Sequence, residues 1–445
     1  MKKINALIGL LVFFLAFQSC SKLEYSPKDQ VFAQGALKDY ASANAAVAGL
    51  YDEMQDATLA FDGYLSIWQY FSDECDWTGT FPTRAEFDRK DVFPSNSTME
   101  GVFSAFYDII NYANYLLEEL PNISSADFTA DDLNKFSGEA RLIRGFAYLH
   151  LVLGWGDVPI VLKATRPDAV GDDLFVSKSP ASEVWSLVVS DLEFAEKNIG
   201  GNPAYRASAN AATALLSRVY LYQGEWQLAY DKADAIIQSG VYSLVPEYEN
   251  VFKEETSENI WILKFNKDDQ NSNAFYYFPA ALGGRRSISP SPQLIAAYED
   301  GDARKDASVA KSGSQNYGIK YLDISTGTDP LYFIRYAEVL LNAAEAAAEL
   351  GMFDEANTYY NMVRNRAGLA DKTLDASNYV DLLLQERFVE LAMEGFHRLV
   401  DLRRRGKAME VLEPEGYDPC DAVWPLPQRD IDRNPNLEQS DCCTC

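Results

Sequence analysis

Three glutamates spaced four residues apart are the side chains of this sequence that could support acid–base chemistry. Glu386, Glu390 and Glu394 lie in segment 385–395, which we expect to be an amphipathic helix. Glycoside hydrolysis requires two carboxyl groups roughly 5 to 9 Å apart. Any two residues four apart on a helix meet that distance, so the pattern fits ion-paired structural positions better than a catalytic pair. The apolar face of this helix would consist of Val380, Leu383, Leu384, Phe388 and Leu391.

The rest of the sequence contains no second catalytic arrangement. His150 and His397 are too far apart to form a His-x-x-x-His zinc pair, and there is neither a phosphate-cradling glycine loop nor a Gly-x-Ser-x-Gly elbow. His150 belongs to a helical pattern over 136–153 that is apolar nearly all round, which indicates a core histidine. We therefore predict that the protein is not an enzyme and uses no metal ion and no cofactor.

Aromatic side chains concentrate in two stretches without a strong periodicity, residues 61–94 and 266–292. Long loops in compact domains are usually functional or disordered, and such aromatic content argues against disorder. A sugar ring has an apolar face and a polar rim, so its binding site needs flat aromatic surfaces and a few fixed hydrogen-bonding groups. Each aromatic taken singly is more simply explained by local packing, but as a group they indicate a ligand-binding platform. The candidates are Trp68, Trp77 and Tyr276 for stacking and Asp73, Arg84 and Arg285 for polar contacts.

Helix pairs must position these loops. The spacing Gly-x-aromatic-x-x-Ala occurs at 224–229 and again at 351–356, each time after an apolar helical pattern. The glycine would end one helix, the aromatic residue would enter the next, and the small alanine would let the two helices pack closely. This spacing is typical of tetratricopeptide-like helix pairs. Together with helical periodicity elsewhere, it predicts an all-α, mostly helical fold with long irregular loops.

The first twenty residues have the order of a secretion signal. Lys2 and Lys3 precede an apolar run over 6–17, and the run is followed by Ser19 and Cys20. The run is shorter than the roughly 20 residues that a membrane-spanning helix needs. We expect a signal peptide over 1–19 and a tether over 20–33 that is lipidated at Cys20, with a plain signal peptide as the alternative. Stable anchoring would require more than one acyl chain.

The composition describes a large and strongly acidic globular protein. The chain has 445 residues, of which 47% are hydrophobic and 13% aromatic, and its formal net charge is −27. The mature chain can therefore bury a large core. Nucleic acid and anionic lipid would be repelled by such a surface, so we expect no nucleic-acid partner and favour a neutral ligand.

Five cysteines remain besides Cys20, and they cannot all pair within one chain. A metal clip formed by the tail is disfavoured, because no histidine lies near and a chain terminus is a poor rigid site. We expect disulfide pairing among Cys420 and the tail cysteines in an oxidising compartment. The five are Cys75, Cys420, Cys442, Cys443 and Cys445.

Five strings follow one another along nearly the whole mature chain. They are 141–148 leading to the Gly-Trp-Gly-Asp-Val-Pro turn at 154–159, 239–244, 335–345 with 364–368, 385–395 with 401–406, and 424–428 with 434–436. In this order they resemble the SusD/RagB family of nutrient-binding outer-membrane lipoproteins. The resemblance implies that residues such as Trp155, Arg403 and Trp424 support the fold rather than contact ligand. The cysteine-rich ending departs from the usual Asn-Pro-Gly-Tyr ending of the family.

The resemblance implies a SusD-like fold, with an N-terminal half over 34–225 and a C-terminal half over 226–445 fused into one globular unit. It implies a lipid-anchored protein on the outside of the outer membrane that binds an oligosaccharide or peptide. It also implies a SusC-like TonB-dependent transporter as the partner. The alternative is a tetratricopeptide-like protein-interaction scaffold in the cell envelope.

Overall fold

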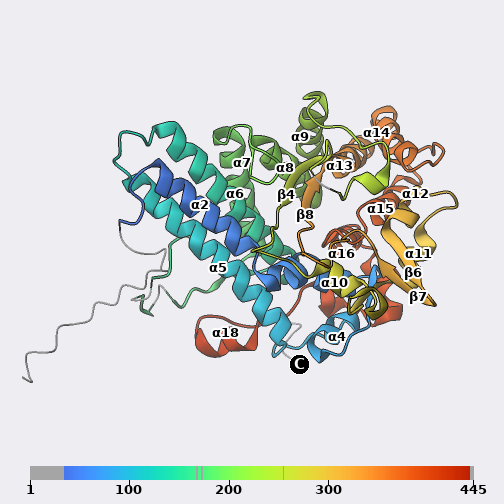
Figure 1. Cartoon of the computed structure of the whole chain (residues 1–445), viewed down its shortest axis with the longest axis horizontal. Helices are drawn as coiled ribbons and strands as arrows, with labels where there is room; N and C mark the ends of the chain where they lie inside the picture. The colour runs from blue at the N-terminus through green and yellow to red at the C-terminus, as the bar shows by residue number, and fades with distance from the viewer. Residues whose placement is uncertain (1–34, 167–168, 172–173, 254, 441–445) are drawn as a thin grey trace, which may run out of the picture. The chain divides into compact units, whose positions relative to one another are not determined.

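The long helices pack largely in chain order. In this computed structural model, which describes residues 35–166, 169–171, 174–253 and 255–440, each helix of the series α5, α6, α7, α8 and α9 packs on the next, and α9 packs on α13, which packs on α14 (Figure 1). Helix α2 contacts α5 and α6. The prediction of a mostly helical protein is confirmed. These helices are α2 (Tyr40–Met54), α5 (Ser97–Glu119), α6 (Ala130–Trp155), α7 (Ala181–Asn198), α8 (Ala209–Gln223), α9 (Trp226–Gln238), α13 (Tyr336–Glu349) and α14 (Phe353–Arg366).

Both predicted helix pairs are present, α8 with α9 and α13 with α14. Gly224 follows α8 with φ +75° and Gly351 follows α13 with φ +77°, in the left-handed region that glycine adopts without strain. Trp226 and Phe353 each begin the second helix of a pair. The alanines three residues after these aromatics are fully buried, so the helices pack closely at that point.

The strands are short and form four two-stranded antiparallel ladders within the described residues. The ladder of β1 with β5 matters for function because it joins the two aromatic stretches. The pairs are β1 (Cys75–Trp77) with β5 (Ile288–Pro290), β2 (Val158–Pro159) with β3 (Lys178–Ser179), β4 (Asn259–Leu263) with β8 (Leu331–Arg335), and β6 (Val309–Ser312) with β7 (Gln315–Gly318).

The aromatic stretches contain more regular structure than the sequence predicts. A π-helix, η1 (Leu59–Ser66), runs into α3 (Ile67–Tyr70), and both are buried throughout. Their polar residues, Asp62, Ser66 and Gln69, are buried together with the apolar ones, so no exposed polar face marks the helical period in the sequence. The other short helices are α4 (Pro82–Asp88), η2 (Leu120–Asn122), η4 (Tyr248–Asn250), α10 (Asn273–Tyr277), η5 (Ala280–Leu282), α11 (Pro292–Ala297), α12 (Ala303–Ser308), α16 (His397–Arg404), α17 (Ala408–Leu412), η6 (Glu413–Glu415), η7 (Pro419–Ala422) and α18 (Gln428–Arg433).

The glutamate helix ends earlier than predicted. Helix α15 spans Tyr379–Glu390, so Glu394 lies beyond it. Met393 has φ +61°, and its N–H donates to the buried carboxyl of Glu74. Gly395 has φ +120°, and a Cβ there would meet the Tyr64 carbonyl oxygen at 2.8 Å. Contacts with a distant segment of the chain therefore stop the helix.

The described residues from Leu37 onward form one compact unit. The boundary predicted between residues 225 and 226 falls in the turn between α8 and α9 and stays a prediction. No described helix is long and apolar enough to cross a membrane. The predicted signal peptide, Cys20 and the tail cysteines Cys442, Cys443 and Cys445 lie outside the described residues, so their roles stay predictions too. Cys75 is a buried free thiol.

Candidate functional site

The ladder between β1 and β5 brings the two aromatic stretches together. Trp77 is opposite Ile288 in this ladder. Beyond it, Thr78 donates its N–H to the Ser287 carbonyl at 2.9 Å and its hydroxyl to the Arg286 carbonyl at 2.6 Å. Thr78 and Arg286 are 208 positions apart in the chain. Hydrogen bonds between backbones thus hold the two stretches in a fixed register.

Arg84 occupies the centre of the resulting site. Its Nε and Nη2 donate to Oδ1 and Oδ2 of Asp62 at 2.8 and 2.6 Å, from α4 to the buried helix η1. Burial acts to lower the pKa of Arg84, but the hydrogen bond and charge of Asp62 outweigh it and raise that pKa. The guanidinium carbon also lies near four aromatic rings, at distances typical of cation–π contacts. The ring centroids are those of Phe81 at 5.3 Å, Phe61 at 5.5 Å, Tyr276 at 5.6 Å and Trp77 at 5.8 Å.

The rings around Arg84 differ in exposure. Phe61 is buried and stacks on Tyr276 at a centroid distance of 4.3 Å. Phe81 is 43% exposed, and Trp77 and Tyr276 are partly exposed. Arg285 is exposed, with its guanidinium carbon 4.8 Å from the Phe81 centroid and Nη2 3.4 Å from the Thr80 hydroxyl. We call Phe61, Trp77, Phe81, Arg84, Tyr276 and Arg285 the aromatic–arginine cluster.

The cluster thus contains four of the six residues proposed from sequence: Trp77, Arg84, Tyr276 and Arg285. It offers flat apolar surfaces beside guanidinium donors, which suits a ligand with an apolar ring face and a hydroxylated rim. Phe61 and Phe81 also belong to the first aromatic stretch, residues 61–94. Their residue type alone did not indicate which rings of that stretch would contact Arg84. Nothing in the sequence singled out Asp62 as the partner of Arg84.

The structure places Trp68 and Asp73 away from this cluster, in structural roles. Trp68 is 1% exposed, its Nε1 donates to the Gly63 carbonyl at 2.7 Å, and its ring lies 4.5 Å from that of Trp424. Asp73 is 5% exposed, and both its carboxylate oxygens accept from Arg398 at 2.7 Å. Because both side chains are buried, neither presents a surface to a ligand, contrary to the expectation from sequence. The residue types alone did not show that these two positions are buried.

The three glutamates are buried and engaged by cations. Burial raises the pKa of Glu386. Burial acts in the same direction on Glu390 and Glu394, but the adjacent arginines, and Lys320 beside Glu394, outweigh it and lower their pKa values. An ion-paired interior group cannot reach a glycosidic bond, so these residues support the fold. Their contacts are Glu386 with Arg304 (2.6 Å) and Arg364 (3.0 Å), Glu390 with Arg335 (2.6 Å), Arg304 (3.0 Å) and Arg366, and Glu394 with Arg335 (2.7 Å) and Lys320 (2.7 Å).

The other family-string residues also hold the core. Trp155 and Trp424 are buried, with ring centroids 5.2 Å apart in an edge-to-face contact. Arg403 donates to the carbonyl oxygens of Leu153 (3.1 Å) and Asp421 (2.7 Å) rather than to a carboxylate. His150 is 1% exposed, its Nδ1 lies 2.9 Å from the Phe146 carbonyl, and burial lowers its pKa to about 3. It is the core histidine that the helical pattern predicted.

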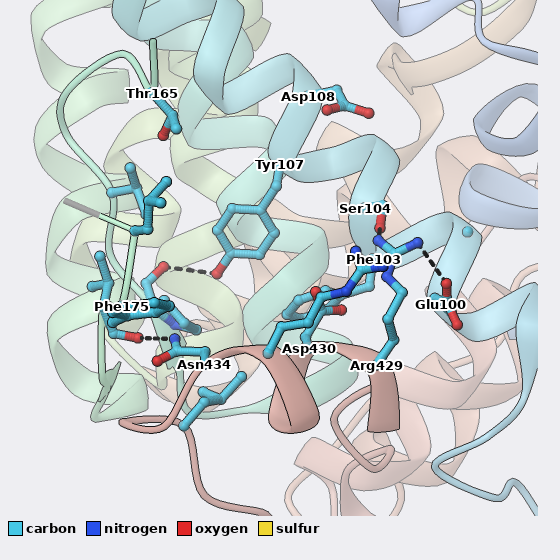
Figure 2. A pocket seen from close by; sticks show the side chains of 17 residues that line it. Glu100, Phe103, Ser104, Tyr107, Asp108, Thr165, Phe175, Arg429, Asp430 and Asn434 are labelled. Atoms are coloured by element: carbon cyan, nitrogen blue, oxygen red, sulfur yellow. Dashed lines mark hydrogen bonds and ion pairs between the residues drawn. The ribbon is translucent and has the colours of Figure 1, made fainter. Parts of the chain in front are cut away.

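A separate pocket of about 700 Å³ lies between α5, α18 and the segment after β2 (Figure 2). None of the six residues proposed from sequence lines it. Across it, Arg429 of α18 pairs with Glu100 of α5 at 2.7 Å and donates to the Ser104 hydroxyl at 3.0 Å. Sequence reasoning missed this pocket, because its walls come from three distant parts of the chain that share no motif. No group of three or more metal-ligating side chains occurs in the part of the chain that the structure describes.

Two family models match this chain. Residues 32–221 match the model described as "Starch-binding associating with outer membrane", and residues 310–441 match the model of the SusD family. SusD-like protein P38 of Formosa agariphila is 27% identical to the chain over 99% of both sequences. SusD-like protein P2 of the same organism is 28% identical over 97% of this chain and 98% of its own length.

Solved structures show the same fold. A SusD superfamily protein from Bacteroides vulgatus superposes with a TM-score of 0.82 at 24% identity, over 91% of this chain and 99% of its own. A laminarin-binding SusD-like protein superposes with a TM-score of 0.81 at 22% identity, over 91% and 100%. A SusD-like carbohydrate-binding protein from Bacteroides fragilis superposes with a TM-score of 0.78 at 21% identity, over 90% of this chain and 99% of its own. The two family models match in order along the chain, and the relatives align with it from end to end. The helix pairs and the buried ion pairs are present in the structure. The chain therefore belongs to the SusD/RagB family.

Proposed function

We propose that this protein binds a neutral oligosaccharide at the aromatic–arginine cluster and passes it to a TonB-dependent outer-membrane transporter. The observation that carries the proposal is the set of rings gathered around Arg84, whose orientation is fixed by Asp62. Rings and donors that are already ordered reduce the entropy lost when a flexible sugar chain is bound. The net charge of −27 favours a ligand without negative charge.

The comparisons support a glycan over a peptide. One family model is described as starch-binding, one neighbour binds laminarin, and another is a SusD-like carbohydrate-binding protein. A protein-interaction scaffold, the alternative from sequence, would not need partly exposed rings stacked beside a fixed arginine. We therefore assign the cluster to sugar stacking, with Trp77, Phe81 and Tyr276 as the ring surfaces and Arg285 as the exposed donor.

The membrane and transporter parts of the proposal rest on the signal pattern ending at Cys20 and on the family. A lipid at Cys20 would hold the protein on the outer membrane, facing the cell exterior, and the folded unit would close over a transporter barrel like a lid. Isolation of a TonB-dependent barrel together with this protein from gently solubilised outer membrane is the expected result. Recovery of the protein without a barrel, under conditions that preserve other lipoprotein complexes, would count against it.

Calorimetry with a panel of neutral oligosaccharides tests the binding site. Maltohexaose, laminarihexaose, xylohexaose and mannohexaose are titrated into wild-type protein and into Trp77→Ala, Tyr276→Ala and Tyr205→Ala. Loss of a stacking ring should cost more than about 1 kcal/mol, so the first two variants should bind several-fold more weakly at an unchanged melting temperature. Tyr205 is 42% exposed and lies outside the cluster, so its variant is the control.

Wild-type affinity in both Trp77→Ala and Tyr276→Ala would show that the sugar binds elsewhere. Absence of binding by any sugar in the panel would favour the scaffold alternative.

A further inference from the structure

The pocket between α5 and α18 shares no residue with the aromatic–arginine cluster. Hydrogen bonds and an ion pair that do not involve the cluster connect its walls. Tyr107 of α5 donates its hydroxyl to the Pro159 carbonyl at 2.7 Å. Asn434, just after α18, donates its side-chain amide to the Val176 carbonyl at 2.8 Å. With the ion pair between Arg429 and Glu100 already described, these bonds join all three walls (Figure 2). The pocket is therefore preformed, which lowers the entropic cost of filling it.

The walls of the pocket combine aromatic surface with polar groups. Figure 2 shows the Tyr107 ring reaching from α5 toward the segment that carries Phe175. Tyr107 and Phe175 are both partly exposed, and Phe103 lies behind Tyr107 at a ring-centroid distance of 5.0 Å. The volume of about 700 Å³ falls within the usual range for small-ligand pockets.

One polar atom of the wall lacks a partner. Oδ2 of Asp430 is buried, and within the described residues it accepts no hydrogen bond. Burial raises the pKa of Asp430, while Arg429 acts to lower it. Arg429 itself donates to Glu100 and Ser104 rather than to Asp430. A buried carboxylate oxygen without a donor is costly, and a turn of the partly exposed Asp430 carboxylate toward the pocket would let it accept from a ligand hydroxyl.

We propose that this pocket is a second sugar-binding site, in which one or two units of a neutral glycan place a ring face against Tyr107 and Phe175 and donate a hydroxyl to Asp430. An anionic ligand would be repelled by Asp430 and Glu100, and a purely apolar ligand would leave the Asp430 oxygen without a donor. The inference rests on the proposed function, because it takes the same class of ligand. Two sites on one protein would hold a long glycan more tightly than either site alone, provided that the glycan is long enough to reach both sites.

The test uses the four hexasaccharides named above and four forms of the full mature protein. These are wild type, a cluster variant that combines Trp77→Ala with Tyr276→Ala, a pocket variant Asp430→Asn, and the combination of all three substitutions. Asp432→Asn is the matched control, because Asp432 lies on the same helix, is exposed and does not line the pocket. Calorimetry gives affinity and stoichiometry, and hydrogen exchange with and without sugar locates the protected segments.

The cluster variant should keep weak binding to the sugar that wild type prefers, with protection at residues 103–107 and 428–434. Asp430→Asn in that background should reduce this residual affinity at least threefold, and Asp432→Asn should not. Asn at 430 keeps the size of the side chain, so a melting temperature within a few degrees of wild type is expected. Phe175→Ala changes a different wall of the pocket and should reduce the residual affinity in the same way. It therefore tests the site independently if Asp430→Asn misfolds.

Complete loss of binding in the cluster variant, with no protection near α18, would overturn the second site and leave the proposed function intact. Residual binding that survives both Asp430→Asn and Phe175→Ala would also overturn it. If no hexasaccharide binds wild type, both the proposed function and the second site are overturned for neutral glycans.

Discussion

Asp62 and Arg84 form a two-point ion pair in which each carboxylate oxygen accepts one hydrogen bond from the same guanidinium group, at 2.8 and 2.6 Å. Two parallel bonds fix the plane of a guanidinium, whereas a single bond would leave it free to turn. The arginine side chain is 15% exposed and that of the aspartate 7%, so the pair is shielded from solvent. This relationship lets one charged group order four rings without offering a free charge to the ligand.

Asp62→Asn should therefore weaken both folding and binding. It leaves Arg84 without a counter-charge in a shielded position, which should cost roughly 1 to 3 kcal/mol of unfolding free energy. The sugar affinity should fall several-fold because Arg84 no longer holds its orientation. Urea unfolding and calorimetry measure the two effects. Glu196→Gln, which breaks a more exposed ion pair with Lys232, should cost less than about 1 kcal/mol and leave affinity unchanged.

Trp68→Phe should lower stability without affecting the bound state. The substitution removes the hydrogen bond to the Gly63 carbonyl and leaves a small cavity against Trp424, at an expected cost of about 1 to 3 kcal/mol. Denaturant unfolding measures this cost, and calorimetry below the melting temperature should give wild-type affinity. If Trp68→Phe folds as stably as wild type but binds sugar poorly, Trp68 contacts the ligand and the structural role assigned to it is wrong.

Glu390→Gln should be among the most destabilising single substitutions in the chain. Its carboxylate is engaged by Arg304, Arg335 and Arg366, and Gln would leave these buried cations short of one negative charge. Removing one member of a buried ion pair costs about 3 to 5 kcal/mol. Equilibrium unfolding gives the value, and Glu410→Gln, at a pair with Lys407 whose glutamate side chain is 67% exposed, should change it by less than about 1 kcal/mol. Equal effects of the two variants would contradict the structural role of Glu390.

Glu74 should make the folded state less stable as pH rises. Burial raises its pKa from 4.5 to about 8, against the opposing hydrogen bond from the Met393 N–H. Between those two values the folded protein holds a proton that the unfolded chain has released, so the free energy of unfolding falls with increasing pH across this window. The contribution is present in full below pH 4.5 and is lost by about pH 8.

Glu74→Gln should remove that pH dependence, because the amide mimics the protonated carboxyl and carries no proton to lose. Urea unfolding at pH 5, 6, 7 and 8 should show a smaller loss of stability in the variant than in wild type. The same substitution at the exposed Glu413 should leave the wild-type pH profile in place. A parallel pH profile for Glu74→Gln and wild type would show that Glu74 is ionised in the folded state.

Cys20→Ala should release the protein from the outer membrane. The prediction follows from the order of Lys2, Lys3, the apolar run and Ser19 before Cys20, and from the need for acyl chains to anchor a chain of this kind. Fractionation in a strain without the cognate transporter should move the variant to a soluble fraction, while wild type stays with the membrane. A variant that remained membrane-bound in that strain would exclude lipid as the anchor.

The helix pairs and the family were predictable from sequence because their signals are local. Gly224 and Gly351 end helices through their own backbone freedom, and Ala229 and Ala356 mark close packing at a fixed spacing after them. The central helix over 136–153 was recognisable because an all-round apolar pattern leaves no solvent-facing side. Such features depend on a few neighbouring residues and hold in any context.

Only the tertiary structure decides whether each residue of the aromatic stretches lies in the core or in the aromatic–arginine cluster. Trp68 and Trp77 have the same side chain and are nine positions apart, yet one lies in the core and the other beside Arg84, because burial depends on which distant segment packs against each ring. The meeting of Arg84 with Tyr276 depends on a strand pairing across about 200 residues. Helix α15 ends at Glu390 because Glu74 and Tyr64 meet the backbone after it. Long-range contacts of this kind leave no period in the sequence, since each partner is selected by the completed fold and not by its neighbours in the chain.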